Sequence, residues 1–177
     1  IDPVFYNIAR WNGNTWTCLR GPIGEANAVF AFGESDVWVG ISAPHHWNGT
    51  SWTDYNVTGT FGGHIMKIWG PTANDVFIVG TNGSIAHFDG STWRRVESGT
   101  TIDLLDIDGS SSTDVWISGY DLSTGQASIL LHGSRFGFEV RYNYQPPYAG
   151  ERSDSITGII TSIWRSDEDS IWALDGA

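Results

Sequence analysis

The stretch DVFIVGTNGSIAHFDGSTW, from Asp75 to Trp93, decides the fold because its main features recur along the chain. Its opening triplet, Asp-Val-aromatic, begins at Asp36, Asp75 and Asp114, so successive copies lie 39 residues apart. A weaker copy begins at Ser170, which is 56 residues after the third and therefore 17 more than the regular spacing. A fixed period of about 40 residues indicates a repeat architecture.

Each repeat reads as four short strands, A to D. Strand A is an apolar segment, in the copies AVFAFG (from Ala28), IMKIWG (from Ile65), LLDIDG (from Leu104) and ITSIWR (from Ile160). Strand B is a continuous apolar run such as VFIV, typical of a strand covered on both faces. Strands C and D flank an Asn-Gly or Asp-Gly pair, which favours a tight hairpin with positive φ. Four strands in about 40 residues predict a β-propeller blade.

The composition agrees with an all-β protein. The 177 residues include 22 Gly and 10 Trp, and only 16% are charged. No segment combines apolar residues at helical spacing with residues that cap a helix. The chain starts with strands C and D and ends with strands A and B, so we predict one four-bladed ring whose last blade is shared between the two ends. The alternative is a fragment of a larger propeller. The predicted ranges are 1–20 (second half of blade 4), 25–58 (blade 1), 64–98 (blade 2), 103–142 (blade 3), 143–158 (loop) and 159–177 (first half of blade 4).

The repeat resembles those of bacterial secreted and cell-surface β-propeller proteins, in the pattern Asp-Val-Trp-x-x-Gly followed by His-Phe-Asp-Gly-x-x-Trp. Within it, DGSTW and NGNTW are similar to the Asp box of sialidase-like propellers. Asp89 and Gly90 are adjacent here, whereas the Asp box has one residue between its Asp and its Gly. The resemblance implies a propeller fold and an extracellular or cell-surface setting. It supplies no catalytic residue, because such propellers include hydrolases, lectins and protein-binding platforms.

Charge and cysteine content exclude several classes of function. The net charge is -11 and the nine Lys and Arg are scattered, which argues against nucleic acid and against an anionic membrane surface. No apolar run is long enough to insert into a membrane. Cys18 is the single cysteine, predicted to be buried, and no metal-ligand spacing or cofactor motif occurs. We therefore expect no metal and no cofactor.

The repeated polar columns are predicted to be structural. The Asp that opens each strand B is expected to accept backbone N–H groups at the A–B turn. His46 and His87 share the column before the turn aromatic, so packing or hydrogen bonding is the favoured role. Asp106 and Asp108 lie two apart on one face of a strand A. They are interpreted as a solvated stretch of a wet channel, with a carboxylate pair for hydrolysis as the alternative.

Departures from the repeat indicate where ligands bind. The blade 3 B–C loop from Gly119 and the long segment 143–158 are predicted to meet on the face opposite the C–D turns. Tyr and Arg are frequent in binding sites, and long loops on a rigid scaffold often carry function. A stiff linker without a binding role is the alternative for this segment. The predicted binding residues are Tyr120, Asp121, Tyr144, Tyr148, Arg152 and His64.

These observations predict a non-enzymatic binding or adhesion module that presents loops to a glycan or a protein. A structural unit that packs against copies of itself is the second hypothesis. A sialidase-like hydrolase is the third, and it lacks recognisable arginine and carboxylate motifs.

Overall fold

The computed structural model describes residues 7–22, 24–121, 128–144, 160–167 and 170–175. Within these ranges the secondary structure consists of strands β1 to β16 and one short 3-10 turn, η1 (Thr81–Gly83). The prediction of an all-β chain is confirmed.

Twelve strands form three antiparallel sheets of four, and in each sheet the strands follow chain order. Blade 1 consists of β3 (Ala28–Gly33), β4 (Asp36–Gly40), β5 (Pro44–Trp47) and β6 (Trp52–Asp54). Blade 2 consists of β7 (Ile65–Thr72), β8 (Asp75–Gly80), β9 (Ile85–Phe88) and β10 (Trp93–Val96). Blade 3 consists of β11 (Asp103–Ser111), β12 (Asp114–Tyr120), β13 (Ser128–Ser134) and β14 (Gly137–Tyr144). Each sheet therefore has the strand number and order of a propeller blade.

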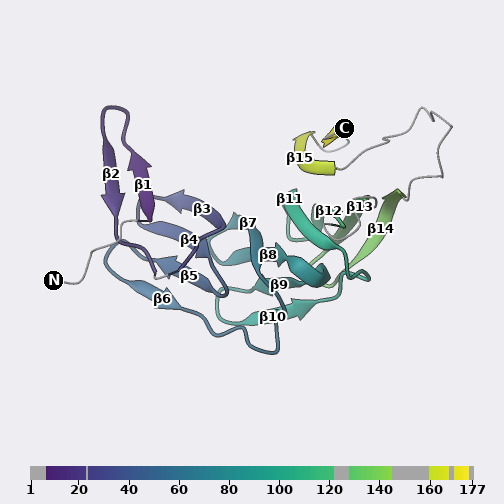
Figure 1. The fold of residues 1–177 in the computed structure, drawn as a ribbon, viewed down its shortest axis with the longest axis horizontal. Helices are drawn as coiled ribbons and strands as arrows, with labels where there is room; N and C mark the ends of the chain where they lie inside the picture. The colour runs from purple at the N-terminus through teal and green to yellow at the C-terminus, as the bar shows by residue number, and fades with distance from the viewer. Residues whose placement is uncertain (1–6, 23, 122–127, 145–159, 168–169, 176–177) are drawn as a thin grey trace.

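Two hairpins occupy the ends of the arc that the three blades form (Figure 1). One contains β1 (Ile8–Trp11) and β2 (Trp16–Leu19), and the other contains β15 (Ile160–Asp167) and β16 (Ser170–Asp175). Each hairpin is a separate two-stranded sheet. The two hairpins therefore do not form one shared four-stranded sheet in this structure, and the number of blades in a closed ring stays a prediction.

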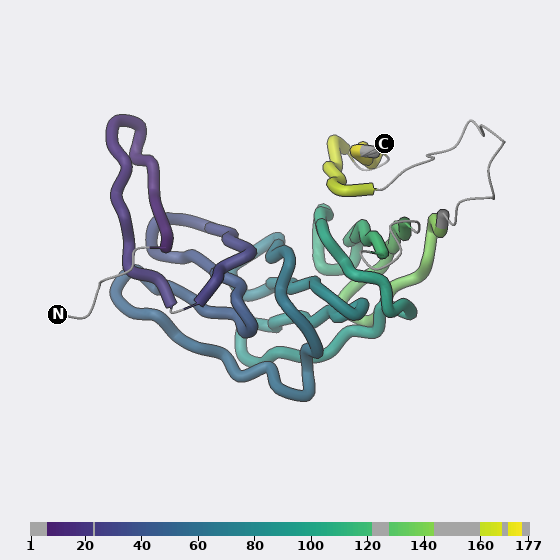
Figure 2. Tube along the Cα trace, viewed as in Figure 1, coloured from purple at the N-terminus to yellow at the C-terminus, as the bar shows by residue number. Residues whose placement is uncertain are grey.

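The curvature of the arc explains why the hairpins stay apart. Large side chains fill the space between neighbouring sheets, and this packing sets the angle between blades. The tube in Figure 2 shows that three blades turn the chain too little to bring the β15–β16 hairpin beside the β1–β2 hairpin.

The core lies between the sheets, and β8 shows why its sequence is continuously apolar. Val76 and Ile78 pack in the cluster shared with blade 1, which contains Trp38. Phe77 and Val79 point the other way and pack against blade 3. These four side chains of β8 are all fully buried. Burial of each such side chain contributes about 1.5–3 kcal/mol, so the middle sheet is stabilised from both faces.

The C–D turns show what the repeated phrase does. Asp89 Oδ1 accepts the N–H groups of Ser91 and Thr92 at 3.0 and 2.8 Å, and Gly90 has φ of 88°. Asn12 and Asn48 accept two backbone N–H groups in the same way. Because Phe88 pairs with Trp93, the loop contains four residues rather than the two of the tightest hairpin. Positive φ occurs at the glycine, as expected, and the Asx side chain holds the rest of the turn.

Candidate functional site

The loop end of blade 3 holds two residues of the predicted binding set in one cross-strand row. Tyr120, at the end of β12, pairs with Ser128, which pairs in turn with Tyr144. Asp121 follows Tyr120 directly and is half-buried. Tyr148 and Arg152 lie outside the described residues. The strand register therefore brings Tyr120 and Tyr144 to the same end of the sheet, and a binding role for them stays a prediction.

His64, the remaining predicted residue, lies at the same end of blade 2 and is exposed. Its backbone N–H donates to Thr81 Oγ1 at 2.9 Å, and its carbonyl accepts the N–H of Thr81 at 3.1 Å. Asn82, the residue after Thr81, donates its N–H to Asp103 Oδ1 at 2.8 Å. Asp103 pairs with Tyr120 across blade 3. Hydrogen bonds and strand pairing thus connect the loop end of blade 2 with the loop end of blade 3.

The acidic pair on strand A of blade 3 joins blades together, which corrects the prediction of a solvated channel stretch. Asp106 is only 5% exposed. Its Oδ2 accepts the Ser162 hydroxyl at 2.6 Å and the Ile163 N–H at 3.0 Å, while Oδ1 pairs with Lys67 at 2.9 Å. Asp108 Oδ2 accepts a further backbone N–H of β15 at 2.7 Å. These carboxylates attach the C-terminal hairpin to blade 3.

The repeated Asp and His columns also pair with each other. In every blade, His Nε2 on strand C lies within hydrogen-bonding distance of the Asp that opens strand B. The imidazole packs against the strand B aromatic, with ring centroids 4.2–4.5 Å apart. Occurrence at the same place in three blades supports the structural role that was predicted, with His rather than backbone N–H as the partner. The pairs are His46–Asp36 (2.8 Å), His87–Asp75 (2.5 Å) and His132–Asp114 (2.9 Å).

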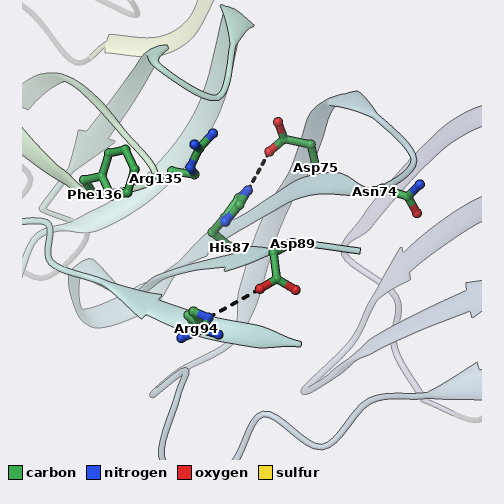
Figure 3. A pocket seen from close by; sticks show the side chains of 7 residues that line it. All are labelled: Asn74, Asp75, His87, Asp89, Arg94, Arg135 and Phe136. Atoms are coloured by element: carbon green, nitrogen blue, oxygen red, sulfur yellow. Dashed lines mark hydrogen bonds and ion pairs between the residues drawn. The ribbon is translucent and has the colours of Figure 1, made fainter. Parts of the chain in front are cut away.

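A pocket of about 570 Å³ opens between blades 2 and 3 (Figure 3). It lies on the turn face, the side of the blades that carries the A–B and C–D turns. Blade 2 contributes the A–B turn and the C–D hairpin, and blade 3 contributes Arg135 and Phe136 from its own C–D turn. Phe136 is 80% exposed, and the Arg135 guanidinium carbon lies 4.8 Å from its ring centroid. Arg135 is fixed by a 2.7 Å bond from Nη1 to Ser112 Oγ. The remaining lining residues are Asn74, Asp75, His87, Asp89 and Arg94.

The pocket contains both carboxylate and guanidinium groups, and these differ in how many of their polar atoms already have partners. Asp89 is held ionised, because the N–H groups of Thr92 and Ser91 lower the pKa of its carboxyl to about 2. Arg94 Nε is 3.4 Å from Asp89 Oδ2, and the Arg94 side chain is 74% exposed. A guanidinium carries five N–H donors. The described bonds of Arg94 and Arg135 use one each, so the pocket presents further cationic donors beside an exposed aromatic ring.

This pocket was not predicted from the sequence, although one signal was present. The blade 3 hairpin reads HGSRFGF where the other repeats have an Asx-Gly turn. In the structure the altered turn places Arg135 and Phe136 in the same pocket as Arg94 of the preceding blade. A break in the repeat was therefore informative on both faces.

Three further features of the described ranges concern metal ligands, membrane-spanning helices and the cysteine. These ranges contain no group of three or more His, Cys, Asp or Glu placed to hold a metal ion. No helix within them is long and apolar enough to cross a membrane. Cys18 is exposed, contrary to the prediction, because it lies in the marginal two-stranded hairpin rather than in a four-stranded sheet.

Comparison with known proteins supports the fold. No protein-family model matches the chain, and no curated protein matches it. Among solved structures, a chain described as "YCF48 bound to D1 peptide" matches with a TM-score of 0.63 and 15% sequence identity. The match covers 97% of this chain and 55% of that one, so the present chain spans about half the length of its structural neighbour. The fold is a β-propeller, as the repeat predicted.

Proposed function

We propose that this chain is a non-enzymatic binding module whose ligand is a polypeptide, held in the turn-face pocket between blades 2 and 3. The observation that carries the proposal is the exposed Phe136, with the Arg135 guanidinium beside its ring and Arg94 in the lining of the same pocket, in a protein of net charge -11. Guanidinium groups bind carboxylates through paired hydrogen bonds, and an exposed aromatic ring supplies an apolar contact. A segment with an acidic side chain next to an apolar one fits this chemistry.

The mixed charge of the pocket favours a peptide over a simple anion. Asp75 and Asp89 line the same space as Arg94 and Arg135, so a purely anionic ligand meets repulsion as well as attraction. A peptide can place a carboxylate at the guanidinium groups and its backbone N–H groups at the acids. The structural neighbour is described as bound to a peptide, which agrees with this class of ligand.

The absence of catalysis is part of the proposal, and two contacts support it. Asp89 keeps a pKa of about 2, so it is a poor general acid near neutral pH. Asp75 is paired with His87 in the arrangement that every blade repeats. The extracellular or cell-surface setting also stays a proposal, and it rests on the resemblance of the repeat.

Selection from a random-peptide phage library, followed by calorimetry with the enriched synthetic peptides, tests the site. Arg94→Ala and Phe136→Ala are expected to weaken binding at least tenfold. Arg95→Ala is the matched control, because Arg95 is the next residue of β10, points to the other face and pairs with Glu97. Equal affinity of all three variants for the peptides would refute this pocket as the binding site.

The same experiment separates the alternatives. Peptides that lose affinity in Tyr120→Ala, but not in Arg94→Ala, would move the site to the loop end with Tyr144 and His64. A library without enriched peptides, together with binding on a glycan array, would favour the glycan hypothesis.

A further inference from the structure

The chain contains three Asn-Gly pairs, and the structure places them in two different settings. Asn12 and Asn48 lie in exposed turns, between β1 and β2 and between β5 and β6, whereas Asn82 lies in η1 of blade 2. An Asn that precedes Gly loses its side-chain amide readily, because Gly has no side chain to shield its backbone nitrogen. The following residue is the same in all three pairs, so a difference in their reactivity has to come from the fold.

The two exposed turns direct hydrogen-bond donors at the Asn side-chain oxygen. Asn48 Oδ1 accepts the N–H groups of Thr50 and Ser51 at 3.0 and 2.9 Å, and it accepts the Thr50 hydroxyl at 2.8 Å. Asn12 Oδ1 accepts two backbone N–H groups, both at 2.9 Å. Loss of the amide begins when the Gly nitrogen attacks Cγ, and negative charge then develops on Oδ1. Donors that already point at this oxygen stabilise the developing charge, as in an oxyanion hole.

The equivalent turn of blade 2 shows that this arrangement favours a charged oxygen. Its Asx residue is Asp89, and the N–H groups of Thr92 and Ser91 lower the pKa of the Asp89 carboxyl to about 2. The turn therefore accommodates a carboxylate in blade 2 where blade 1 has an amide. Conversion of Asn48 to Asp would give blade 1 the turn that blade 2 already has.

Asn82 is held by contacts with three other segments. Its N–H donates to Asp103 Oδ1 at 2.8 Å, and its Nδ2 donates to the Gly62 carbonyl at 3.3 Å. Gly83 is buried, and a Cβ there would overlap the Thr100 carbonyl oxygen. The Gly nitrogen and the amide carbon form a ring only when backbone and side chain adopt the geometry of attack. The contacts around Asn82 oppose that movement.

The glycines of the two exposed turns have more space around them than Gly83. A Cβ on Gly13 would meet no described atom within 4 Å. A Cβ on Gly49 would lie 2.8 Å from the side chain of Ser35, which is exposed and can turn aside. The space around the reacting nitrogen therefore decreases from Gly13 to Gly49 to Gly83.

We propose that Asn12 and Asn48 are sites of spontaneous deamidation in the folded chain, and that the contacts around Asn82 protect it. Hydroxide removes the proton from the Gly nitrogen, and this nitrogen forms a bond to Cγ. The Cγ–Nδ2 bond then breaks, and ammonia leaves with the bonding pair and a proton from water. Water opens the resulting cyclic imide, giving Asp when the new N–Cγ bond breaks and isoaspartate when the bond to the backbone carbonyl carbon breaks. The net reaction consumes one water, releases one ammonia and adds one carboxyl group to the turn.

Peptide mapping by mass spectrometry, after incubation of the folded chain in mildly alkaline buffer, tests the proposal. Trypsin cleaves after Arg20 and Lys67, so the three Asn residues fall in separate peptides. Asn12 is expected to react fastest and Asn48 next, with Asn82 at least tenfold slower than Asn48.

The same chain unfolded in guanidinium chloride is the control. There the three rates should lie close together, because the contacts of the fold are lost. Equal rates at Asn82 and Asn48 in the folded chain would overturn the proposal. Conversion of Asn12 and Asn48 in the unfolded chain alone would overturn it as well.

A pair of variants tests the protection of Asn82 directly. Asp103→Ala removes the acceptor of the Asn82 N–H and is expected to raise the rate at Asn82 at least threefold. Asp103→Asn keeps an oxygen acceptor and is the matched control, with a rate near that of the wild type. The rates at Asn12 and Asn48, measured in the same samples, should not change, which separates local release from general unfolding. An unchanged rate at Asn82 in Asp103→Ala would overturn the protective role of this bond.

Discussion

Replacement of Asp106 by alanine is expected to lower the free energy of unfolding by about 2–5 kcal/mol. The carboxylate is 5% exposed and joins three elements: Lys67 of β7, its own strand β11, and Ser162 and Ile163 of β15. Removal of the carboxylate leaves these donors without their acceptor.

The magnitude follows from the burial of each partner. Ile163 is 6% exposed, so its N–H group loses an acceptor where water has little access, at a cost of about 1–3 kcal/mol. The Ser162 hydroxyl is half-buried and can turn toward another acceptor, so it adds about 1 kcal/mol. The Lys67 side chain is 45% exposed and becomes hydrated, which limits its share to about 0–1 kcal/mol.

Urea unfolding of the wild type and three variants tests this reasoning. Asp106→Asn retains one oxygen acceptor and is expected to lose about half as much stability as Asp106→Ala. Lys67→Met isolates the ion pair and should lie within about 1 kcal/mol of wild type. Hydrogen exchange should show that the 160–167 strand opens first in Asp106→Ala. A loss below about 1 kcal/mol in Asp106→Ala, or faster exchange elsewhere with β15 unchanged, would refute the role of this carboxylate.

Three further predictions concern the turns and the pocket. Asp89 has a folded pKa of about 2 against an ordinary value of 3.8, so its stabilising effect is present above about pH 4 and is lost as pH falls toward 2; Asp89→Asn keeps the turn acceptor and should weaken this acid dependence in pH titrations of unfolding. Gly80→Ala should destabilise by about 1–3 kcal/mol in thermal unfolding, because a Cβ there overlaps the His64 carbonyl oxygen, whereas Gly33→Ala meets no atom within 4 Å and should be nearly neutral. Phe136→Ala should change stability by less than about 0.5 kcal/mol, since the ring is 80% exposed, so its expected loss of peptide binding is separable from unfolding by calorimetry.

The repeat alone was sufficient to predict the blade. The uninterrupted apolar run of β8 requires cover on both faces, and the structure provides it from blades 1 and 3. The Asp and His columns were assigned structural roles because each recurs at a fixed place. The structure unites the two columns into pairs such as His87 with Asp75. Local pattern and tertiary packing agree wherever a residue repeats.

Properties that depend on angles between blades could not be predicted in this way. Ring closure depends on how far each sheet is rotated from the last, and a repeat period contains no information about that rotation. The pocket depends on Arg135 of blade 3 reaching the side of blade 2, which no single repeat contains. The burial of Asp106 could not be predicted because its partners on β15 lie 56 and 57 residues away in the chain.

The two departures from the repeat in blade 3 show how burial separates a structural role from a binding role. Asp106 breaks the pattern of strand A, but its oxygens are engaged by donors from three elements and it is shielded from water. Arg135 and Phe136 break the pattern of the C–D turn, and there the ring remains exposed beside donors with capacity for further bonds. A departure whose polar atoms are all bonded within the chain stabilises the fold, because nothing remains to contact a ligand. A departure that leaves an aromatic ring and cationic donors at the surface is not explained by bonds within the chain. For this reason the altered turn of blade 3, rather than the acidic pair of its inner strand, is where we expect a ligand to bind.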